Sequence, residues 1–348
     1  MTRTTTRRTP GRTQAGAPAG RAPGRTRLGA ALAILPLVVA LAACSSSNAE
    51  EPGGSKLAAD AKAAGLTVNT TADQDRITTT ESAEAIALLP DAYKDKDTLV
   101  FSVSAYVAPL TFLADDDKTP IGSETDIAHL IGDALGKEVQ IEVKAWADWP
   151  LALQSGAVDS TTSNVTVTEE RKELYDFSSY RVDQLGWLVK ADNTKITKIT
   201  EAKDIAGLTV AVGSGTNQEK ILIAWDEENK AAGLEPVAIE YFENDGDTIL
   251  ALQSGRIDTS FGPNATAAYK AVVAPDEFKV VGTVNGGWPA TAQIAAATLK
   301  GNGLAPAFTA AINHAIEDGS YTKVLGRWGL TAEAITTSET NPPGLPKS

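Results

Sequence analysis

The chain of 348 residues has little sulfur and little imidazole: one cysteine, one methionine and two histidines. A single cysteine, Cys44, cannot form a disulfide within the chain, and outside the cytoplasm a lone thiol needs a function of its own. His129 and His314 both fall in helical patterns, where we expect ordinary helix residues. No cluster of His and Cys with the spacing of metal ligands can be built from this sequence, so we expect neither a metal nor another cofactor.

Basic residues are also scarce beyond the first part of the chain. Residues 1–27 hold seven Arg and no acid, whereas the rest has 24 Lys and Arg against 44 Asp and Glu, a net charge of about −20. Nucleic acids bind basic surfaces, so this balance argues against a nucleic-acid partner. The acidity otherwise reflects solubility and does not identify a ligand.

A long apolar run is missing as well. The run over residues 28–42 has 15 residues and is interrupted by Pro36, whereas a membrane-spanning helix needs ~20. Because it follows a basic stretch, it predicts an export signal peptide over residues 1–43. The pair Arg7-Arg8 leaves twin-arginine export open as an alternative to the general secretory route.

The end of this run, Leu41-Ala-Ala-Cys44, resembles a bacterial lipobox, in which the cysteine is lipidated and becomes the mature N-terminus. The resemblance implies that Cys44 anchors the protein to the bacterial cell membrane on its extracytoplasmic side; the alternative is an incidental thiol in a signal peptide. Residues 44–56 are polar and predict a flexible tether. Residues 57–97 form a lead-in segment with weak helical patterning.

A nine-residue phrase occurs twice, as LALQSGAVD over residues 151–159 and as LALQSGRID over residues 250–258, 99 residues apart. This spacing suits a small domain and predicts two lobes of one topology, facing each other across a ligand cleft. In each copy a helix ends at Gly156 or Gly255, and a buried strand follows. The alternative is a purely structural helix–cap–strand unit, with function in the residues after each copy.

Strands and helices alternate through the body, which predicts α/β units with a largely parallel sheet. Strands are expected over residues 99–103, 139–143, 209–212, 236–241, 257–261, 279–281 and 293–298, and helices over 126–135, 146–154, 218–229, 248–253, 265–273 and, as a pair, 306–328. The last helices follow the second lobe, so we expect them to pack back on the first. We expect lobe 1 at 98–187 and 291–332, lobe 2 at 188–290, and a C-terminal tail at 333–348. Two crossings, near residues 186–190 and 282–293, then form a hinge suited to closure.

Two segments carry candidate chemistry. The first, residues 163–171 (SNVTVTEER), presents hydroxyls, backbone N–H groups and then Arg171, whose planar guanidinium pairs bidentately with a carboxylate. The alternative is that Thr168 starts a helix and that Arg171 is a surface residue balancing the two acids before it. The second, residues 213–217 (GSGTN), lies between a strand and a helix, where such a loop aims N–H groups at an anion or forms a tight turn.

The order and spacing of these segments resemble the extracellular solute-binding proteins of polar amino acid ABC transporters, family 3, over about residues 99–330. The resemblance is carried by residues 122–126 (GSETD), 153–159 (LQSGAVD), 166–171 (TVTEER), 176–180 (DFSSY), 212–218 (VGSGTNQ) and 252–258 (LQSGRID). It implies a two-lobed periplasmic-binding-protein-like fold of type II with a two-strand hinge. It also implies a non-enzymatic, monomeric receptor that captures a small carboxylated, amino-acid-like solute. An ABC permease with its ATPase would be its partner.

The resemblance implies roles for lobe 1 residues in the ligand site. Arg171 would clamp the α-carboxylate of the ligand. Ser163, Asn164 and Thr166 would offer hydroxyl, backbone and side-chain contacts to the amino-acid core. These assignments follow from matching positions in the family pattern and predict where the ligand lies.

Further ligand contacts are implied in lobe 2 and among aromatic residues. Thr216 and Asn217 would close on the carboxylate from lobe 2. Tyr106 and Trp146 lie near family positions that line the pocket. For these two residues and for Trp149, plain core packing is an equally open alternative.

One position departs from the family pattern. An Asp that pairs with the ligand's α-ammonium usually follows the second repeat, and here that position is Pro263, which has neither a side-chain acceptor nor an N–H. The neighbouring Asn264 offers a neutral acceptor, which pairs less strongly with a cation. Either another acid meets the amine, with Glu124 and Asp258 available, or the ligand is not an ordinary α-amino acid.

Two other functions fit the same scaffold. A ligand sensor that signals to a membrane kinase would have the same sequence features as a transport receptor. An enzyme, such as a dehydratase or a lytic enzyme on these lobes, would need a positioned acid or base in the cleft. The sequence shows no nucleophile–base pair, and both histidines fall in helices away from the ligand loops, so we do not expect an enzyme.

Overall fold

A computed structural model describes residues 68–104 and 107–347. The predicted signal peptide, the predicted lipidation site Cys44 and the predicted tether lie outside the described residues, as does Tyr106. The chain from residue 68 onward forms a mixed α/β body around one sheet, so the predicted α/β class is confirmed.

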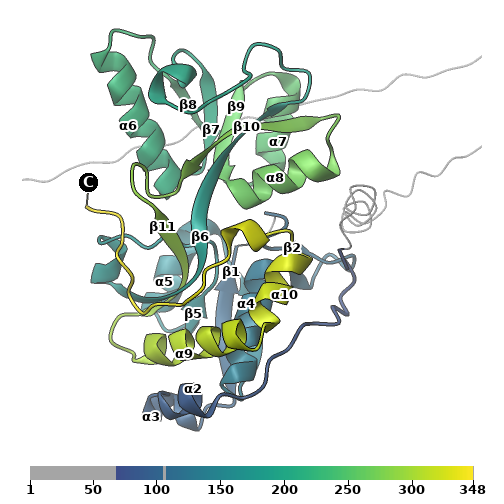
Figure 1. The fold of residues 1–348 in the computed structure, drawn as a ribbon, viewed down its shortest axis with the longest axis vertical. Helices are drawn as coiled ribbons and strands as arrows, with labels where there is room; N and C mark the ends of the chain where they lie inside the picture. Colours follow the sequence, from purple (N-terminus) through teal and green to yellow (C-terminus); the bar gives the residue numbers. More distant parts are fainter. Residues whose placement is uncertain (1–67, 105–106, 348) are drawn as a thin grey trace, which may run out of the picture. The chain divides into compact units, whose positions relative to one another are not determined.

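Nine strands form this sheet, in the order β4-β1-β5-β11-β6-β9-β7-β8, with β10 also paired to β6 (Figure 1). The strands are β1 (Thr98–Val103), β4 (Glu138–Val143), β5 (Ser160–Thr161), β6 (Tyr175–Lys190), β7 (Thr209–Val212), β8 (Ala238–Tyr241), β9 (Thr259–Pro263), β10 (Phe278–Asn285) and β11 (Ala292–Leu299). A separate hairpin joins β2 (Phe112–Leu113) and β3 (Pro120–Ile121). Strands β4, β1 and β5 are parallel, as are β8, β7 and β9, which confirms parallel units at both ends of the sheet.

Strand β6 is the longest element and belongs to both ends of the sheet. Its first half pairs with β11 up to Asp183, opposite Ala292, and its second half pairs with β10 from Gln184, opposite Asn285. The sequence analysis predicts no strand over residues 175–190, and the change of partner comes a few residues before the expected 186–190. We keep the name lobe 1 for the part built on β4-β1-β5-β11 and lobe 2 for the part built on β9-β7-β8.

The helices follow the predicted order with shifted ends. They are α2 (Ala83–Ala87), α3 (Asp91–Lys94), α4 (Ser123–Ala134), α5 (Trp149–Gln154), α6 (Asn217–Ala231), α7 (Asp245–Ser254), α8 (Asn264–Val273), α9 (Leu304–Glu317) and α10 (Ser320–Arg327). Helix α4 begins three residues earlier than expected, because Gly122 has φ of 130° and its carbonyl accepts a hydrogen bond from the Thr125 hydroxyl at 2.7 Å. Among the described residues, none of the helices is long and apolar enough to cross a membrane.

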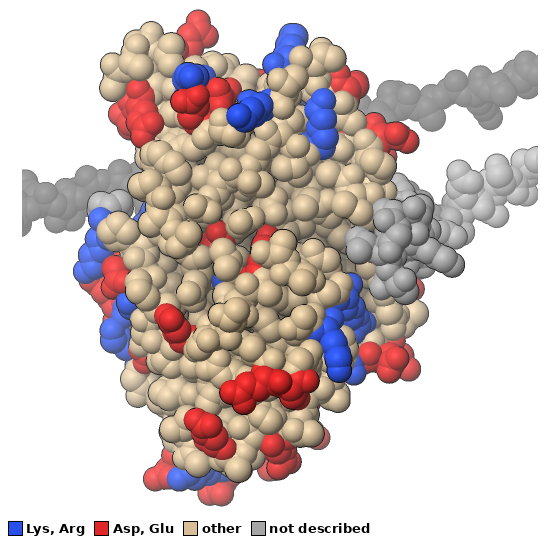
Figure 2. All heavy atoms as spheres, in the orientation of Figure 1, with Lys and Arg blue, Asp and Glu red and all other residues tan. Residues whose placement is uncertain are grey.

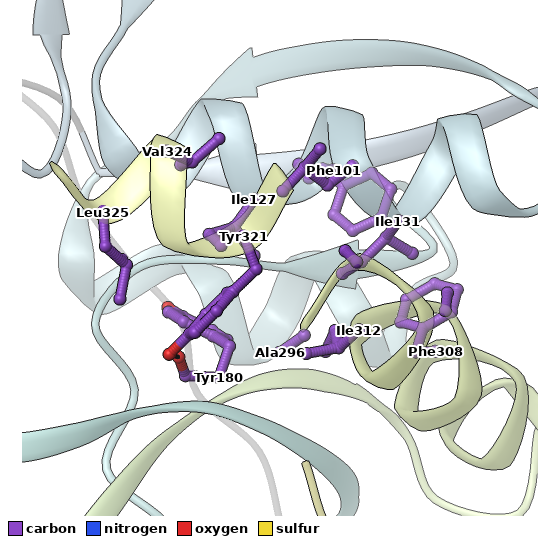
Figure 3. Packing of buried hydrophobic residues seen from close by; sticks show 14 of the residues in the cluster. Phe101, Ile127, Ile131, Tyr180, Ala296, Phe308, Ile312, Tyr321, Val324 and Leu325 are labelled. Carbon is purple, nitrogen blue, oxygen red and sulfur yellow. Dashed lines mark hydrogen bonds between the residues drawn. The ribbon is translucent and has the colours of Figure 1, made fainter. Parts of the chain in front are cut away.

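The C-terminal helices α9 and α10 pack against lobe 1, as predicted. Figure 3 shows their apolar side chains meeting those of α4 and β1, and Phe101 stacks on Phe308 with ring centroids 5.6 Å apart. The buried Tyr321 of α10 donates a hydrogen bond to the carbonyl of Tyr180 on β6 at 2.7 Å. This contact joins the end of the chain to the long strand, and it satisfies a hydroxyl that burial would otherwise leave unpaired.

Lobe 2 has its own core between β6 and α6. Trp187 of β6 stacks on Phe261 of β9 at 3.9 Å and on Trp225 of α6 at 5.7 Å. All three side chains are fully buried. The second half of β6 is therefore held by aromatic packing in lobe 2, while its first half is held by β11 in lobe 1.

The repeated phrase forms the predicted helix–glycine unit in both lobes. Helix α5 ends before Gly156, which has φ of 71°, and α7 ends at Gly255, which has φ of 74°. Both glycines occupy the left-handed region that ends helices. The strands start one residue after the phrase, at Ser160 and Thr259.

The segment after α10 returns along lobe 1 beside β6 (Figure 1). It begins with a 3₁₀ turn, η4 (Thr331–Glu333). Leu345 then forms a bridge with Thr168, and Thr340 one with Ser178. The tail thereby covers the segment that leads to Arg171.

Candidate ligand-binding site

Arg171 lies at the start of a 3₁₀ turn, η2 (Arg171–Glu173), and not of the α-helix that the sequence suggested. The Thr168 hydroxyl accepts a hydrogen bond from the Arg171 N–H at 3.0 Å, but the N-cap of this turn is Glu170 and not Thr168 as the sequence suggested. The guanidinium donates to the Thr166 carbonyl in lobe 1 at 2.8 Å and to the Gly215 carbonyl in lobe 2 at 3.4 Å. It thus reaches from one lobe to the other.

Two tryptophan rings lie beside this guanidinium, and no acid of the described part of the chain forms an ion pair with it. Its central carbon lies 5.5 Å from the ring centre of Trp146 and 5.9 Å from that of Trp149. Burial lowers the pKa of Arg171 to about 10, although nearby acids oppose the shift. The two acids before it have other partners, since Glu169 pairs with Lys172 and Glu170 with Lys220. Arg171 is therefore not the surface counter-ion of these acids.

Thr166 lies directly beside Arg171. Its carbonyl accepts the guanidinium, and its hydroxyl donates to Asp183 Oδ2 at 2.7 Å. Thr166 is 4 % exposed and forms a bridge with Ile294 of β11. The structure thus brings together Arg171 and Thr166, two residues predicted to bind the ligand.

Ser163 and Asn164 lie nearby, and their side chains are engaged within lobe 1. The Ser163 and Thr161 hydroxyls are 3.0 Å apart. Asn164 has φ of 54°, a conformation that Asn tolerates better than most residues. Its N–H donates to Glu124 at 3.1 Å, and its side-chain oxygen accepts a hydrogen bond from Arg181.

In lobe 2, Thr216 and Asn217 form the start of α6. The Thr216 hydroxyl donates to the Gly213 carbonyl at 2.6 Å and accepts from the Glu219 N–H at 3.2 Å, so it is a helix cap. The Asn217 side chain donates to the Gly286 carbonyl. Both side chains already form hydrogen bonds within the protein. An anion at this helix start would therefore bind to backbone N–H groups.

The tryptophans differ in their surroundings. Trp149 is 3 % exposed and packs on Tyr175, with ring centroids 4.9 Å apart, in a core cluster of lobe 1. Trp146 is only partly buried, and its indole nitrogen is the atom nearest to where a side chain on Gly215 would lie, 4.0 Å away. Trp149 is thus a core residue, whereas Trp146 lies where the two lobes meet.

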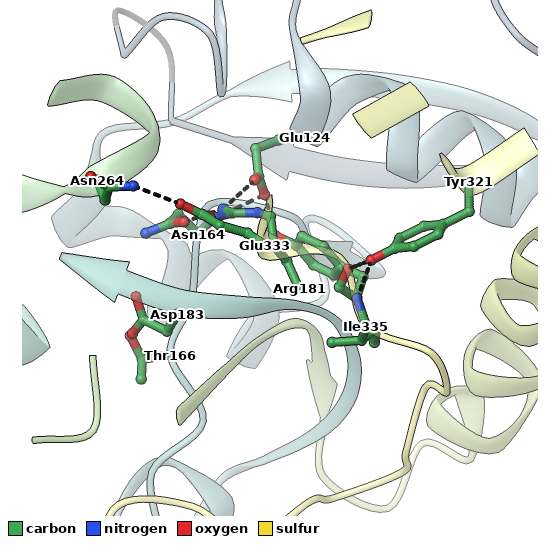
Figure 4. Close-up of polar contacts among 10 residues, drawn as sticks. Glu124, Asn164, Thr166, Arg181, Asp183, Asn264, Tyr321, Glu333 and Ile335 are labelled. Carbon is green, nitrogen blue, oxygen red and sulfur yellow. Dashed lines mark hydrogen bonds and ion pairs between the residues drawn. The ribbon is translucent and has the colours of Figure 1, made fainter. Parts of the chain in front are cut away.

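A buried charged network surrounds Arg181 of β6 (Figure 4). Arg181 pairs with Glu124 at 3.2 Å and with Glu333 of η4, and Tyr180 donates to Glu124. Burial alone would lower the pKa of Arg181, but the two carboxylates outweigh it and raise the pKa. Asn264 donates to Glu333 at 3.3 Å and so belongs to this network.

Asp183 is a residue that the sequence analysis missed. It is 1 % exposed, and burial raises the pKa of its carboxyl to about 6, opposed in part by the hydrogen bond from Thr166 and by Arg181. The available signal was an acid two residues before the largely apolar run 185–190. Acids in buried strands are rare unless they have a function or a partner.

An open hollow beside α4 is not part of this region. It is lined by residues of the lead-in and of α4 and β4, among them Thr79, His129 and Lys137. None of the predicted ligand residues lines it. Burial lowers the pKa of His129 to about 4, so this histidine is neutral at pH 7.

The chain matches a known protein family over most of the described body. A family model for bacterial extracellular solute-binding proteins, family 3, matches residues 99–331. The chain belongs to this family. Family members of known structure are two-lobed, so the predicted two-lobed fold is confirmed.

Three proteins similar to this chain are named for the amino acids that they bind. Arginine-binding protein ArgT of Corynebacterium glutamicum is 27% identical over 248 residues, which is 71% of this chain and 79% of that protein. L-cystine-binding protein TcyJ of Escherichia coli is 31% identical over 166 residues, 47% of this chain and 58% of that protein. An ancestral arginine-binding protein solved with arginine has 29% identity and a TM-score of 0.58, covering 67% of this chain and 98% of that chain.

Proposed function

We propose that this solute-binding protein captures a small amino-acid-like carboxylate between its two lobes. The observation that carries the proposal is the Arg171 guanidinium: it lies beside two tryptophan rings, it donates to carbonyls of both lobes, and no described acid pairs with it. A partly buried guanidinium without an acid beside it is costly unless an anion is supplied. A bidentate carboxylate fits a guanidinium better than any other common anion except phosphate.

The contacts between the lobes support binding by closure. Gly215, the acceptor from Arg171, lies one residue before Thr216, and Lys220 of α6 pairs with Glu170 of lobe 1. These contacts join the start of α6 to the segment around Arg171. A ligand carboxylate at Arg171 would replace the weak 3.4 Å contact to Gly215 and would itself face the N-terminus of α6.

The cellular role that we propose also depends on two features of the sequence, the leader and Cys44. The leader and Cys44 would place the protein outside the cytoplasm, anchored to the bacterial membrane by a lipid. Delivery of the ligand to an ABC permease with its ATPase follows the usual role of this family. A sensor role would use the same ligand site and differ in its membrane partner.

An enzyme is less well supported. The named relatives are binding proteins, and one structural neighbour is an ancestral amino acid-binding protein that is a precursor of cyclohexadienyl dehydratase. In the present chain, His314 contacts Thr80 at 3.1 Å and His129 lies in α4, and neither contacts Arg171 or Thr166. The proposal is therefore a binding protein without catalytic residues.

The test is ligand-induced stabilisation of wild type and of Arg171→Ala. Twenty L-amino acids, their deaminated acids, their decarboxylated amines and betaines are each added at high concentration. A ligand at 100 times its Kd adds about 2.7 kcal/mol to the free energy of unfolding, a clear rise in Tm. We expect at least one carboxylate to stabilise wild type, and Arg171→Ala to lose this effect.

The matched control is Arg256→Ala in lobe 2. Arg256 is exposed and pairs with Glu240 at 2.8 Å, far in the chain from the ligand segments. This variant should respond to the ligand as wild type does. Equal affinity of Arg171→Ala and wild type for the same carboxylate would rule out the role assigned to Arg171.

A further inference from the structure

Asp183 lies at the point where β6 passes from lobe 1 to lobe 2. It pairs with Ala292 of β11, and the next residue, Gln184, pairs with Asn285 of β10. Its carbonyl accepts a hydrogen bond from the Gly286 N–H at 2.9 Å. The residue is therefore fixed by both crossing strands at once.

The carboxylate of Asp183 is buried without a cation. Its oxygen Oδ2 accepts the Thr166 hydroxyl at 2.7 Å, and within the described ranges no side chain forms an ion pair with it. The nearby Arg181 is already held by Glu124 and Glu333 (Figure 4). A buried carboxylate with one neutral hydrogen bond is costly, and natural proteins usually retain such a group for a function.

The other acids near the crossing are occupied. Glu124 accepts hydrogen bonds from Arg181, Tyr180 and the N–H of Asn164. Glu333 accepts from Arg181 and Asn264. Asp183 is thus the acid of this set that forms no ion pair within the described residues.

Thr166 links this carboxylate to the Arg171 guanidinium, which likewise forms no ion pair within the described residues. Its carbonyl accepts from Arg171 at 2.8 Å, and its hydroxyl donates to Asp183 at 2.7 Å. One residue thus separates an unpaired positive group from an unpaired negative group. The carboxylate and ammonium of an α-amino acid are two bonds apart at the carbon that joins them, so a zwitterion offers the complement to both groups.

On the side of lobe 2, Gly286 packs directly against the carboxylate of Asp183. A side chain on Gly286 would place its Cβ 2.1 Å from Asp183 Cγ, so only glycine leaves room for the acid there. The Gly286 carbonyl accepts the Asn217 side chain at the start of α6. Asp183 therefore lies between Thr166 of lobe 1 and Asn217 of lobe 2, two residues predicted to bind the ligand.

The register also relates Asp183 to the position where the sequence lacks an acid. Pro263 of β9 pairs with Leu185 of β6, and Asp183 lies two residues before Leu185. Paired residues and residues two apart along a strand share one face of a sheet. The carboxylate absent at Pro263 is thus present on the adjacent strand, diagonal to it.

We infer that Asp183 binds the α-ammonium of the ligand while Arg171 binds its α-carboxylate, with Thr166 between them. This inference rests on the proposed function, since it assumes a carboxylate ligand at Arg171. It assigns the cation-binding role to a residue of the crossing strand, so that binding of an amine connects the ligand to the strand shared by both lobes. The ligand class is then an α-amino acid with a free ammonium, in contrast to a simple carboxylic acid.

The experiment measures binding of L-amino acids and of their deaminated acids by titration calorimetry, with wild type, Asp183→Asn and Asp192→Asn. Asp183→Asn is isosteric, and its amide oxygen still accepts the Thr166 hydroxyl. Asp192→Asn removes the same charge at an exposed position just after β6. For the L-amino acid that binds wild type most tightly, we expect Asp183→Asn to lose on the order of 30-fold or more in affinity, as for a buried charge pair that loses one partner. Affinity for the deaminated acid should change less, so that the preference of wild type for the amino acid largely disappears, and Asp192→Asn should match wild type.

A second variant tests whether the position of the Asp183 carboxylate, and not only its charge, determines the preference for the amino acid. Gly286→Ala leaves the acid in place but displaces its carboxylate, and should lower the same preference without removing a charge. If Asp183→Asn keeps both the affinity and the preference of wild type, the role of Asp183 is overturned while the proposed function stands. If wild type binds only acids without an amine, the inference fails and the carboxylate site remains. Absence of any amino-acid or carboxylate binding to wild type would overturn both.

Discussion

Asp159 and Asp258, which are 99 residues apart, make the same contact in the two lobes. Each ends one copy of the repeated phrase, and each accepts a backbone N–H of the neighbouring strand at 2.8 Å, from Val100 in β1 and from Thr209 in β7. The N–H of each aspartate returns a hydrogen bond to the carbonyl of the same residue, at 2.8 Å and 2.9 Å. The repeated phrase is thus a structural unit that joins a helix end to a parallel strand, and the predicted ligand residues lie outside it.

The two aspartates should differ in their contribution to stability. Asp159 is half-buried and also pairs with Lys96 at 2.5 Å, whereas Asp258 is exposed. We expect Asp159→Ala to lower the free energy of unfolding by about 1–3 kcal/mol, because it leaves a partly buried N–H without its acceptor. Asp258→Ala should cost roughly half as much, since water replaces the carboxylate. Urea unfolding of both variants tests this, and equal losses would contradict the burial argument.

The buried charge of Asp183 should cost stability in a pH-dependent manner. Its pKa in the folded protein is about 6, against an ordinary value of 3.8. A folded-state pKa above the unfolded one means that stability is greatest below the ordinary pKa and is lost as the pH rises through about 6. The charged groups that set this pKa are Arg181 on β6, Glu333 on η4 and Arg171 on η2.

We therefore expect Asp183→Asn without ligand to be more stable than wild type by up to about 3 kcal/mol at pH 8. At pH 4 the gain should nearly vanish, because wild type is then protonated at this position. Thermal and urea unfolding at both pH values measure the difference. A variant that is less stable than wild type at pH 8 would show that the carboxylate is satisfied in the folded protein.

Much of the fold can be predicted from local sequence signals. Helix α9 has an apolar stripe with helical spacing, and α7 ends at a glycine. Both signals are contained within one element, so no knowledge of partners is required. Strand β6 lacks such a signal: Arg181 and Asp183 interrupt its apolar residues, and only pairing with β11, β10 and β9 makes it a strand.

In the candidate site, too, only residues that are close in the sequence could be predicted to act together. Arg171 and Thr166 belong to one short segment, and their chemistry points to a carboxylate from sequence alone. The contact of Thr166 with Asp183 joins residues 17 apart, and that of Arg181 with Glu333 joins residues 152 apart. Such partners become visible only when the chain is folded. For that reason Glu124 and Asp258 looked available in the sequence, while the structure shows both in other contacts.

Removal of Glu333 should destabilise lobe 1, because it takes one of two carboxylates from the buried Arg181. Glu333 is 2 % exposed, and its removal leaves Arg181 with Glu124 alone. We expect Glu333→Ala to lower the free energy of unfolding by about 3 kcal/mol, the lower end of the cost of breaking a buried ion pair, because one partner remains. Glu339→Ala, an exposed acid of the same tail, should change it by less than about 0.5 kcal/mol. Similar values for both variants would exclude a stabilising role for this pair.

The end of the chain should support the segment that carries Arg171. The Leu345 carbonyl accepts the Glu169 N–H at 2.8 Å, and the Leu345 N–H donates to the Val167 carbonyl at 3.1 Å. Asn341 adds a contact, since its side-chain oxygen accepts the Phe177 N–H at 2.9 Å. Removing residues 341–348 deletes these hydrogen bonds, which should lower the free energy of unfolding by about 2–3 kcal/mol in urea unfolding.

The same truncation should also weaken ligand binding, because Val167 and Glu169 flank the path from Thr166 to Arg171. We expect a loss of several-fold in affinity for the ligand found with wild type, measured by titration calorimetry at a temperature where the truncated chain is folded. Lys347→Ala is the control: it removes only the exposed pair with Glu173 and should leave stability and affinity close to those of wild type. If truncation lowered stability but left affinity unchanged, the Arg171 segment would hold its geometry through Thr168 and Ile294 alone, and the tail would be a covering element of lobe 1 without influence on the site.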